Sequence, residues 1–123
     1  MTGVQTCALP IYDVEIHNNL GITLQGLGRL KEAEVSYRRA LQINPNFAEA
    51  HNNLGSALQG LNQLTDAEAC YRRALQINPN YAKAYCNLGA TLHDLEHFEE
   101  AESCYRKSLQ LKPNDAEIGR AHV

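Results

Sequence analysis

Apolar and polar residues follow one another along this chain with the spacing of amphipathic helices. Core-type residues recur every three or four positions between residues 14 and 27, and again between residues 30 and 41. The first stripe contains His17, Leu20, Gly21, Leu24 and Leu27, and the second contains Leu30, Ala33, Tyr37, Ala40 and Leu41. A short polar segment with a glycine separates the two stripes. The pattern predicts two helices joined by a turn.

This pair of stripes returns at a fixed period of 34 residues. The period is marked by Gly21, Gly55 and Gly89, by Ala33, Ala67 and Ala101, and by Pro45, Pro79 and Pro113. In the second unit the stripes read His51, Leu54, Gly55, Leu58 and Leu61, then Leu64, Ala67, Tyr71, Ala74 and Leu75. A period of this length is typical of stacked supersecondary units, each of which buries its apolar face only against its neighbours. We therefore predict an all-α fold with units 14–47, 48–81 and 82–115.

Residues at the predicted helix ends agree with this division. Asn46 to Glu49 reads N-x-x-E and Thr65 to Glu68 reads T-x-x-E, so both predict a capping box at a helix start. Each second helix runs into a proline, which disfavours helical geometry in the residue before it. We expect these helices to end near Ile43, Ile77 and Leu111.

Gly28 stands where the first unit must turn between its helices, and glycine takes the left-handed conformation of such turns at little cost. The equivalent residues, Asn62 and Glu96, fit that conformation less well.

The repeated residues resemble the pattern of tetratricopeptide repeat proteins, in which an aromatic residue, Leu-Gly, Ala, a second aromatic, Ala and Pro recur at this period. In the third unit the matching residues are Tyr85, Leu88, Gly89, Leu92, Ala101, Tyr105, Ser108 and Pro113, with Ser108 in place of the usual alanine. His17 and His51 replace the leading aromatic residue in the first two units. The resemblance implies an α-solenoid of three antiparallel helix-turn-helix units plus the start of a fourth, which begins near 114–117.

The two ends of the sequence do not fit the repeat. Residues 1–11 read M-T-G-V-Q-T-C-A-L-P-I and residues 118–123 read I-G-R-A-H-V. Both stretches resemble the translation of a sequencing-library adapter. We therefore expect residues 1–12 and 118–123 to be non-native irregular tails, and residues 13–117 to be an internal fragment of a longer repeat array.

Composition narrows the classes of partner. Hydrophobic residues make up 44% of the chain and charged residues 20%, with a net charge of −3 and both signs interspersed. Nucleic-acid binding would need a basic patch, so we expect no nucleic-acid partner. The apolar runs are far shorter than the roughly 20 residues of a membrane-spanning helix, so we expect no membrane span. Without Cys7 the chain has an odd number of thiols, which weakly favours a reducing, cytoplasmic location over an oxidising one.

Residues with catalytic or metal-binding chemistry do not form a recognisable site. The chain has no C-x-x-C, P-loop, G-x-G-x-x-G or Ser/His/Asp set, so we expect neither an enzyme nor a cofactor. His93 and His97 have the spacing of two metal ligands on one helix, but the predicted turn falls between them. We interpret Cys70 and Cys104, which are period equivalents, as small packing residues.

Pairs of basic residues recur on the second helices, as Arg38-Arg39, Arg72-Arg73 and Arg106-Lys107. Glu34, Glu68 and Glu102 stand four positions before the first member of each pair. This is the favourable order for ion pairs on a helix surface, and it indicates a solvated, self-neutralised face rather than a site for an anionic partner.

A polar stripe on each first helix lies away from the core stripe at 100° per residue. We name it the groove stripe; its members are Glu15, Asn18, Asn19, Ile22 and Gln25 in the first unit, Glu49, Asn52, Asn53, Ser56 and Gln59 in the second, and Lys83, Cys86, Asn87, Ala90 and His93 in the third. In tetratricopeptide repeat proteins this face lines a concave groove that holds extended peptides, so the resemblance implies a peptide-binding groove here.

Asn19, Asn53 and Asn87 would form a ladder along that groove. A carboxamide both donates and accepts hydrogen bonds, so the ladder could hold a peptide backbone whatever its side chains. This ladder is similar to the asparagine ladder of O-linked N-acetylglucosamine transferases. The alternative to peptide binding is that these asparagines form hydrogen bonds between neighbouring helices. Lys83 is the sole strong cation on the stripe, unlike the cationic clamp with which chaperone-adaptor relatives hold a C-terminal carboxylate.

Three functions follow from this interpretation. The first is a scaffold that binds a peptide or protein partner in its groove. The second is the substrate-recruiting arm of a larger enzyme, such as a glycosyltransferase. The third is a structural segment that self-associates through uncapped ends.

Overall fold

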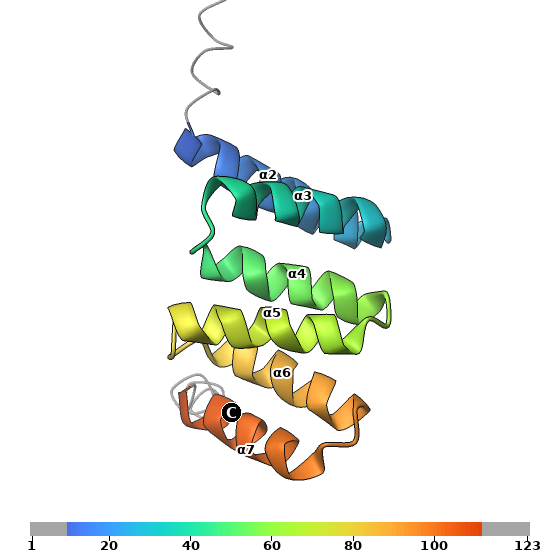
Figure 1. Ribbon diagram of the computed structural model, residues 1–123, viewed down its shortest axis with the longest axis vertical. Helices are drawn as coiled ribbons and strands as arrows, with labels where there is room; N and C mark the ends of the chain where they lie inside the picture. Colours follow the sequence, from blue (N-terminus) through green and yellow to red (C-terminus); the bar gives the residue numbers. More distant parts are fainter. Residues whose placement is uncertain (1–9, 112–123) are drawn as a thin grey trace, which may run out of the picture.

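The computed structural model of the protein describes residues 10–111, and every regular element within them is an α-helix (Figure 1). The helices are α2 (Pro10–Gly26), α3 (Leu30–Ile43), α4 (Ala48–Gly60), α5 (Leu64–Ile77), α6 (Ala82–Asp94) and α7 (Phe98–Leu111). This confirms the predicted all-α fold, with two helices in each unit. The expected start of a fourth unit lies outside the described residues.

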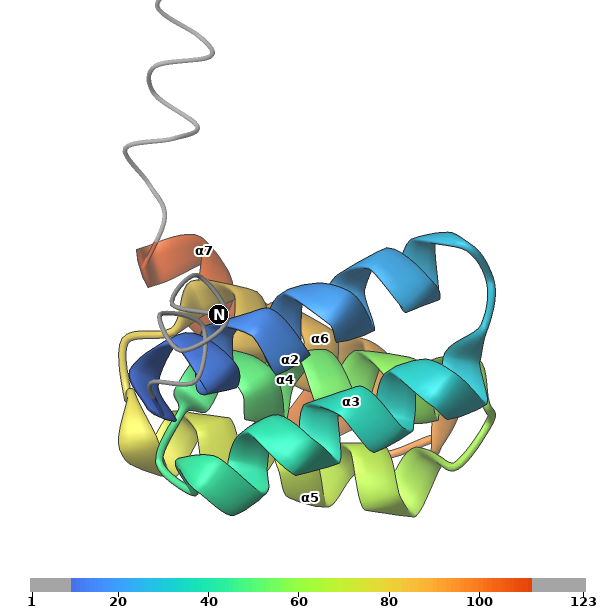
Figure 2. The ribbon, with the colours of Figure 1, turned by 90° about the horizontal axis from the view of Figure 1, so that it is seen from above.

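The helices pack in chain order. Within each unit the two helices are neighbours, and α3 packs on α4 and α5 on α6 to join the units. Figure 1 shows the units stacked along the long axis of the molecule, and the view from above in Figure 2 shows α2 and α4 on one side and α3 and α5 on the other. First helices therefore share one face of the stack.

Large side chains from all three units form one continuous core. Tyr37, Tyr71 and Leu58 have no exposed surface, and Leu88 and Leu92 are buried beside them. Burying one such side chain stabilises a protein by about 1.5–3 kcal/mol. Because the core crosses both unit boundaries, each unit depends on its neighbours for stability.

The turn inside each unit closes in the same way in all three units. Gly28, Asn62 and Glu96 have φ of 80°, 62° and 64°, which is the left-handed region. The backbone N–H that follows each of them donates to the carbonyl five residues earlier, at 2.8–2.9 Å, as in a Schellman motif. The expectation for Gly28 is confirmed, and Asn62 and Glu96 adopt the same conformation although they suit it less well.

The two predicted capping boxes are wrong. The N-cap residues are Phe47 for α4 and Gln63 for α5, and neither makes a side-chain capping bond. Thr65 is therefore already inside α5. Ahead of α4, the side-chain oxygen of Asn44 accepts the backbone N–H of Asn46 at 3.1 Å, and this local turn takes the place of a cap.

The helix ends at Ile43 and Ile77 are confirmed, whereas Leu111 is the last described residue. At the other end, α2 begins at Pro10. The helix therefore includes three residues that we assigned to an irregular tail of residues 1–12. The remainder of that tail and residues 118–123 lie outside the described part of the chain.

Part of the predicted core stripe of α2 is exposed. Leu20 is 46% exposed and Leu27 is 64% exposed, whereas Leu54, one period after Leu20, is 3% exposed. The difference arises because α4 packs on α3 of the preceding unit, and no described helix precedes α2.

Candidate functional site

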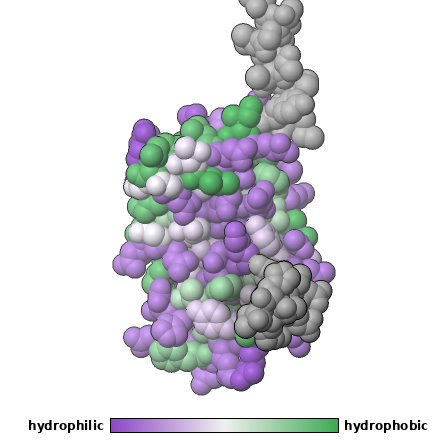
Figure 3. Space-filling model, turned by 180° about the vertical axis from the view of Figure 1, so that it is seen from behind, coloured by the Kyte–Doolittle hydropathy of each residue, from purple (hydrophilic) through white to green (hydrophobic). Residues whose placement is uncertain are grey.

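The groove stripe lies on the shared face of the first helices, and the structure divides its members into three degrees of exposure. Figure 3 views the molecule from this side and shows mostly hydrophilic residues across the middle of the face. The exposed members that we predicted are Glu15, Asn19, Glu49, Lys83 and His93; the half-buried members are Gln25, Asn53, Gln59 and Asn87; and the buried members are Asn18 and Asn52.

Asparagines of neighbouring units are hydrogen bonded to each other. Nδ2 of Asn53 donates to Oδ1 of Asn18 at 3.1 Å, and Nδ2 of Asn87 donates to Oδ1 of Asn52 at 3.0 Å. The acceptor residues are only 2% exposed. The prediction that Asn18 and Asn52 line the groove is therefore wrong, because the next first helix covers them. The alternative that asparagines bond neighbouring helices is correct for these two pairs.

The two donor asparagines retain hydrogen-bonding groups that the bond between helices does not use. Each of Asn53 and Asn87 uses one N–H of its amide in the bond between helices. Its carbonyl oxygen and second N–H have no partner among residues 10–111, and both side chains are half-exposed. These two amides can therefore both accept and donate toward a molecule lying on the stripe.

The glutamines of the stripe are bonded to tyrosines of the same unit. The hydroxyl of Tyr37 donates to Oε1 of Gln25, and that of Tyr71 donates to Oε1 of Gln59, both at 2.8 Å. A tyrosine hydroxyl is protonated at neutral pH and can donate; burial raises the pKa of Tyr37 further, to about 12, and also raises that of Tyr71. The sequence prediction missed these bonds, although Gln and Tyr recur together 12 residues apart in the first two units.

A second bond of Gln25 crosses between units. Its Nε2 donates to Oγ of Ser56 at 2.8 Å. The first two units are thus joined along the stripe by the pair Gln25–Ser56 as well as by Asn18–Asn53. These contacts hold α2 and α4 in a fixed register, which makes the floor of the stripe a preorganised surface.

Charges on the stripe are sparse. Glu15 and Glu49 occupy equivalent positions near the starts of α2 and α4, and Lys83 takes that position in α6. Lys83 is the only lysine or arginine among the described residues of the groove stripe. The surface therefore lacks the several cations that a clamp for a terminal carboxylate needs.

Comparison with known proteins fits this architecture. A sequence profile described as "Tetratricopeptide repeat" matches residues 46–114, and another described as "TPR repeat" matches residues 26–62. The chain belongs to the tetratricopeptide repeat (TPR) family. No curated protein matches the sequence.

Solved TPR structures superpose on most of the chain. The first TPR of Spaghetti (RPAP3) bound to the HSP90 peptide SRMEEVD has a TM-score of 0.81 at 28% identity, over 83% of this chain and 81% of that chain. MamA has a TM-score of 0.78 at 30% identity, over 81% of this chain and 58% of that chain. The TPR domain of Arabidopsis OM64 has a TM-score of 0.83 over 94% of this chain and 100% of that chain, but at 24% identity it supports the fold alone.

The third TPR unit differs from the first two at its turn. His93 replaces the glutamine of the other units, and Tyr105, one period after Tyr71, is 36% exposed. The ring of His93 meets Phe98 edge-on, with ring centroids 5.3 Å apart. His97 lies beyond this turn, ahead of α7, and residues 10–111 contain no group of three or more potential metal ligands.

The first arginine of each basic pair on the second helices is ion-paired as predicted. Arg38, Arg72 and Arg106 form ion pairs of 2.9–3.0 Å with Glu34, Glu68 and Glu102. Each of these three pairs joins residues four positions apart on one second helix, as the spacing predicted.

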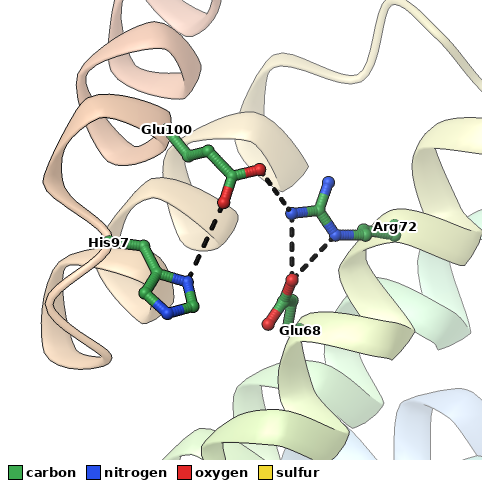
Figure 4. A network of polar contacts seen from close by, with 4 residues as sticks. All are labelled: Glu68, Arg72, His97 and Glu100. Atoms are coloured by element: carbon green, nitrogen blue, oxygen red, sulfur yellow. Dashed lines mark hydrogen bonds and ion pairs between the residues drawn. The ribbon is translucent and has the colours of Figure 1, made fainter.

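One of these arginines also reaches the next TPR unit. Arg72 contacts Glu100 at 3.3 Å, and Glu100 contacts Nδ1 of His97 at 3.8 Å (Figure 4). All of these side chains are exposed to solvent, so the network contributes at most about 1 kcal/mol to stability.

The cysteines at equivalent positions pack as predicted. Cys70 and Cys104 are half-buried against the core, and burial raises the pKa of both thiols, to about 11 for Cys70. Cys86, by contrast, is exposed on the groove stripe.

No helix in residues 10–111 has an apolar stretch long enough to cross a membrane.

Proposed function

We propose that this chain is a protein-interaction module that holds an extended peptide along the groove stripe. The observation that carries the proposal is the pair of half-exposed amides, Asn53 and Asn87, each fixed to the preceding unit through one N–H. Because they are held in place before a ligand arrives, they lose little side-chain entropy when they bind one. Each presents an acceptor and a donor, which is what a peptide backbone requires.

The comparison with RPAP3 supports the proposal. Its first TPR, 28% identical to this chain, is bound to the HSP90 peptide SRMEEVD. Interaction with another protein is therefore a function that this TPR architecture can serve.

The recognition that we propose differs from capture of a carboxylate terminus. Lys83 alone supplies a cation among the described stripe residues, and Glu15 and Glu49 carry the opposite charge. We therefore expect SRMEEVD to bind no better than a peptide of the same composition with its C-terminal carboxylate amidated.

A panel of 12-residue peptides of random sequence, screened by fluorescence anisotropy, tests the proposal. We expect several peptides to bind, and we expect NMR titration with the tightest to shift backbone signals of α2, α4 and α6. A bulky Asn19→Trp substitution on the stripe should weaken binding, whereas Lys31→Trp on the opposite, exposed surface of α3 should not.

Two results would overturn the proposal. One is a panel in which no peptide binds. The other is a bound peptide whose shifts fall on α3, α5 and α7 while Asn19→Trp leaves its affinity unchanged.

A further inference from the structure

The two junctions between first helices are not equivalent. Between α2 and α4, side chains of the stripe form two hydrogen bonds, Asn53 to Asn18 and Gln25 to Ser56. Between α4 and α6, within the described residues, Asn87 to Asn52 matches the first of these bonds, whereas the bond of Gln25 to Ser56 has no counterpart. The second junction therefore lacks the glutamine-to-serine bond of the first.

The missing bond traces to one residue. Gln59 accepts from Tyr71 at 2.8 Å, just as Gln25 accepts from Tyr37, so the two amides are held in the same way. The position of Ser56 is taken in the third unit by Ala90, which has no oxygen to accept from Nε2 of Gln59. Gln59 and Ala90 are both half-buried and keep part of their surface in solvent, so a ligand can reach this point.

We propose that Nε2 of Gln59 is the anchor of the groove, and that it donates to an oxygen of the bound peptide at the place where Ser56 supplies a hydroxyl in the preceding junction. The inference rests on the proposed function and adds to it the point of attachment. The ligand chemistry is a peptide oxygen acceptor, either a backbone carbonyl or the carboxylate of an Asp or Glu side chain.

The surroundings favour such an acceptor. On α6, Lys83, Asn87 and Ala90 follow one another at i, i+4 and i+7, so they share one face of the helix. Lys83 attracts negative charge toward this face, and the second N–H of Asn87 adds a donor. At the first junction one N–H of Gln25 Nε2 is already donated to Ser56, so that junction has one donor fewer to offer a ligand than Gln59 has.

Ser56 and Ala90 provide a matched pair of substitutions. Ala90→Ser should give Gln59 an internal partner and weaken binding of the tightest peptide of the 12-residue panel by about 3- to 10-fold, the effect of one hydrogen bond. Ser56→Ala removes the internal acceptor of Gln25 and so frees its Nε2 in the same way; it should leave the Kd for the peptide unchanged or lower it. Since serine and alanine already alternate at this position, both variants should keep the helicity of the parent chain, which circular dichroism checks.

NMR of the side-chain amides gives a second measurement. The Nε2 signals of Gln59 should shift when the peptide is added to the parent chain, and this shift should be lost in Ala90→Ser. Peptide variants with Asp→Asn or Glu→Gln changes identify the source of the oxygen. If one of them abolishes the effect of Ala90→Ser, the acceptor is that carboxylate; if none does, it is a backbone carbonyl.

The inference is overturned if Ala90→Ser binds the panel peptide as tightly as the parent chain, or if the Gln59 signals do not move on binding. Either result would leave the proposed function standing. Failure of the parent chain to bind any peptide would instead overturn the proposed function.

Discussion

The ring of Tyr71 occupies the space that a side chain at Gly55 would need. A Cβ atom on Gly55 would lie 2.7 Å from Cε1 of Tyr71, closer than real Cβ atoms come to a neighbour. Gly21 and Tyr37 have the same relationship, at 2.4 Å. The recurring spacing of glycine and tyrosine along the chain thus reflects a contact between the two helices of one unit.

The first prediction is that Gly55→Ala destabilises the protein. Alanine should gain about 0.5–1 kcal/mol of helix propensity, but overpacking against a buried ring costs about 1–3 kcal/mol. We expect a net loss of about 1–2 kcal/mol in the free energy of unfolding, measured by urea denaturation. Gly26→Ala is the control, because a Cβ there meets nothing within 4 Å; a loss of the same size at Gly26 would contradict the packing explanation.

The second prediction concerns the turn at Glu96, where a residue with a side chain holds a φ of 64°. A left-handed conformation costs an ordinary residue about 1–2 kcal/mol and costs glycine little. Glu96→Gly should therefore raise the free energy of unfolding by about 1 kcal/mol in urea denaturation.

Glu99→Gly, inside the first turn of α7, provides the contrast, since glycine there lowers helix propensity. If both substitutions destabilised the protein, backbone strain at Glu96 would not contribute significantly to the free energy of unfolding.

The third prediction tests the asparagine pair at the first junction. Asn53→Ala should leave the buried oxygen of Asn18 without its donor and reduce the free energy of unfolding by about 1–3 kcal/mol. Asn19→Ala, one residue after Asn18 and exposed, should change it by no more than about 0.5 kcal/mol. Equal effects from the two substitutions would show that the hydrogen bond to Asn18 does not hold the junction.

The fourth prediction concerns stability at alkaline pH. Burial raises the pKa of Tyr37 from 10.0 to about 12, so the folded chain keeps the hydroxyl proton more tightly than the unfolded chain does. The resulting stabilisation is complete below pH 10 and is lost as the pH rises from 10 toward 12. Urea denaturation across this range should show a falling stability, and the fall should be smaller in Tyr37→Phe. An unchanged fall in that variant would exclude Tyr37 as a cause.

The fifth prediction concerns the thiols. Cys70 is half-buried and its pKa is raised to about 11, so little reactive thiolate is present at neutral pH, whereas Cys86 is exposed. Brief treatment with iodoacetamide should alkylate Cys86 well before Cys70, as measured by mass spectrometry of the digested protein. Equal rates at the two sites would contradict the packing role of Cys70.

Much of the fold could be predicted from the sequence because each unit repeats the same local signals. The two stripes, the glycine at the turn and the proline after the second helix gave the order of the helices and the ends at Ile43 and Ile77. The turn at Glu96 could be located by its equivalence to Gly28, although its own residue type argues against a left-handed turn. The capping boxes failed because N-x-x-E and T-x-x-E are short patterns: α4 starts after a turn at Asn44 and α5 after Gln63, and neither helix start has a side-chain cap.

The groove stripe was predicted less well, because the position of the neighbouring helix decides which residues are exposed. Asn18 and Asn19 lie 100° apart on one helix, and the helical wheel placed both on the polar face. The next first helix covers Asn18 and leaves Asn19 in solvent. The bond between Gln25 and Tyr37 crosses the turn of the unit, so neither helix considered alone could reveal it.

The hydrogen bonds between asparagines of successive units allow the middle unit to be repeated in tandem. Residues 48–81 contain both an acceptor, Asn52, for the unit that follows and a donor, Asn53, for the unit that precedes. A tandem duplication of this segment would therefore pair every new amide at the added boundary, and would leave no buried oxygen without a donor. Each added unit would extend the groove stripe by one further pair of amides.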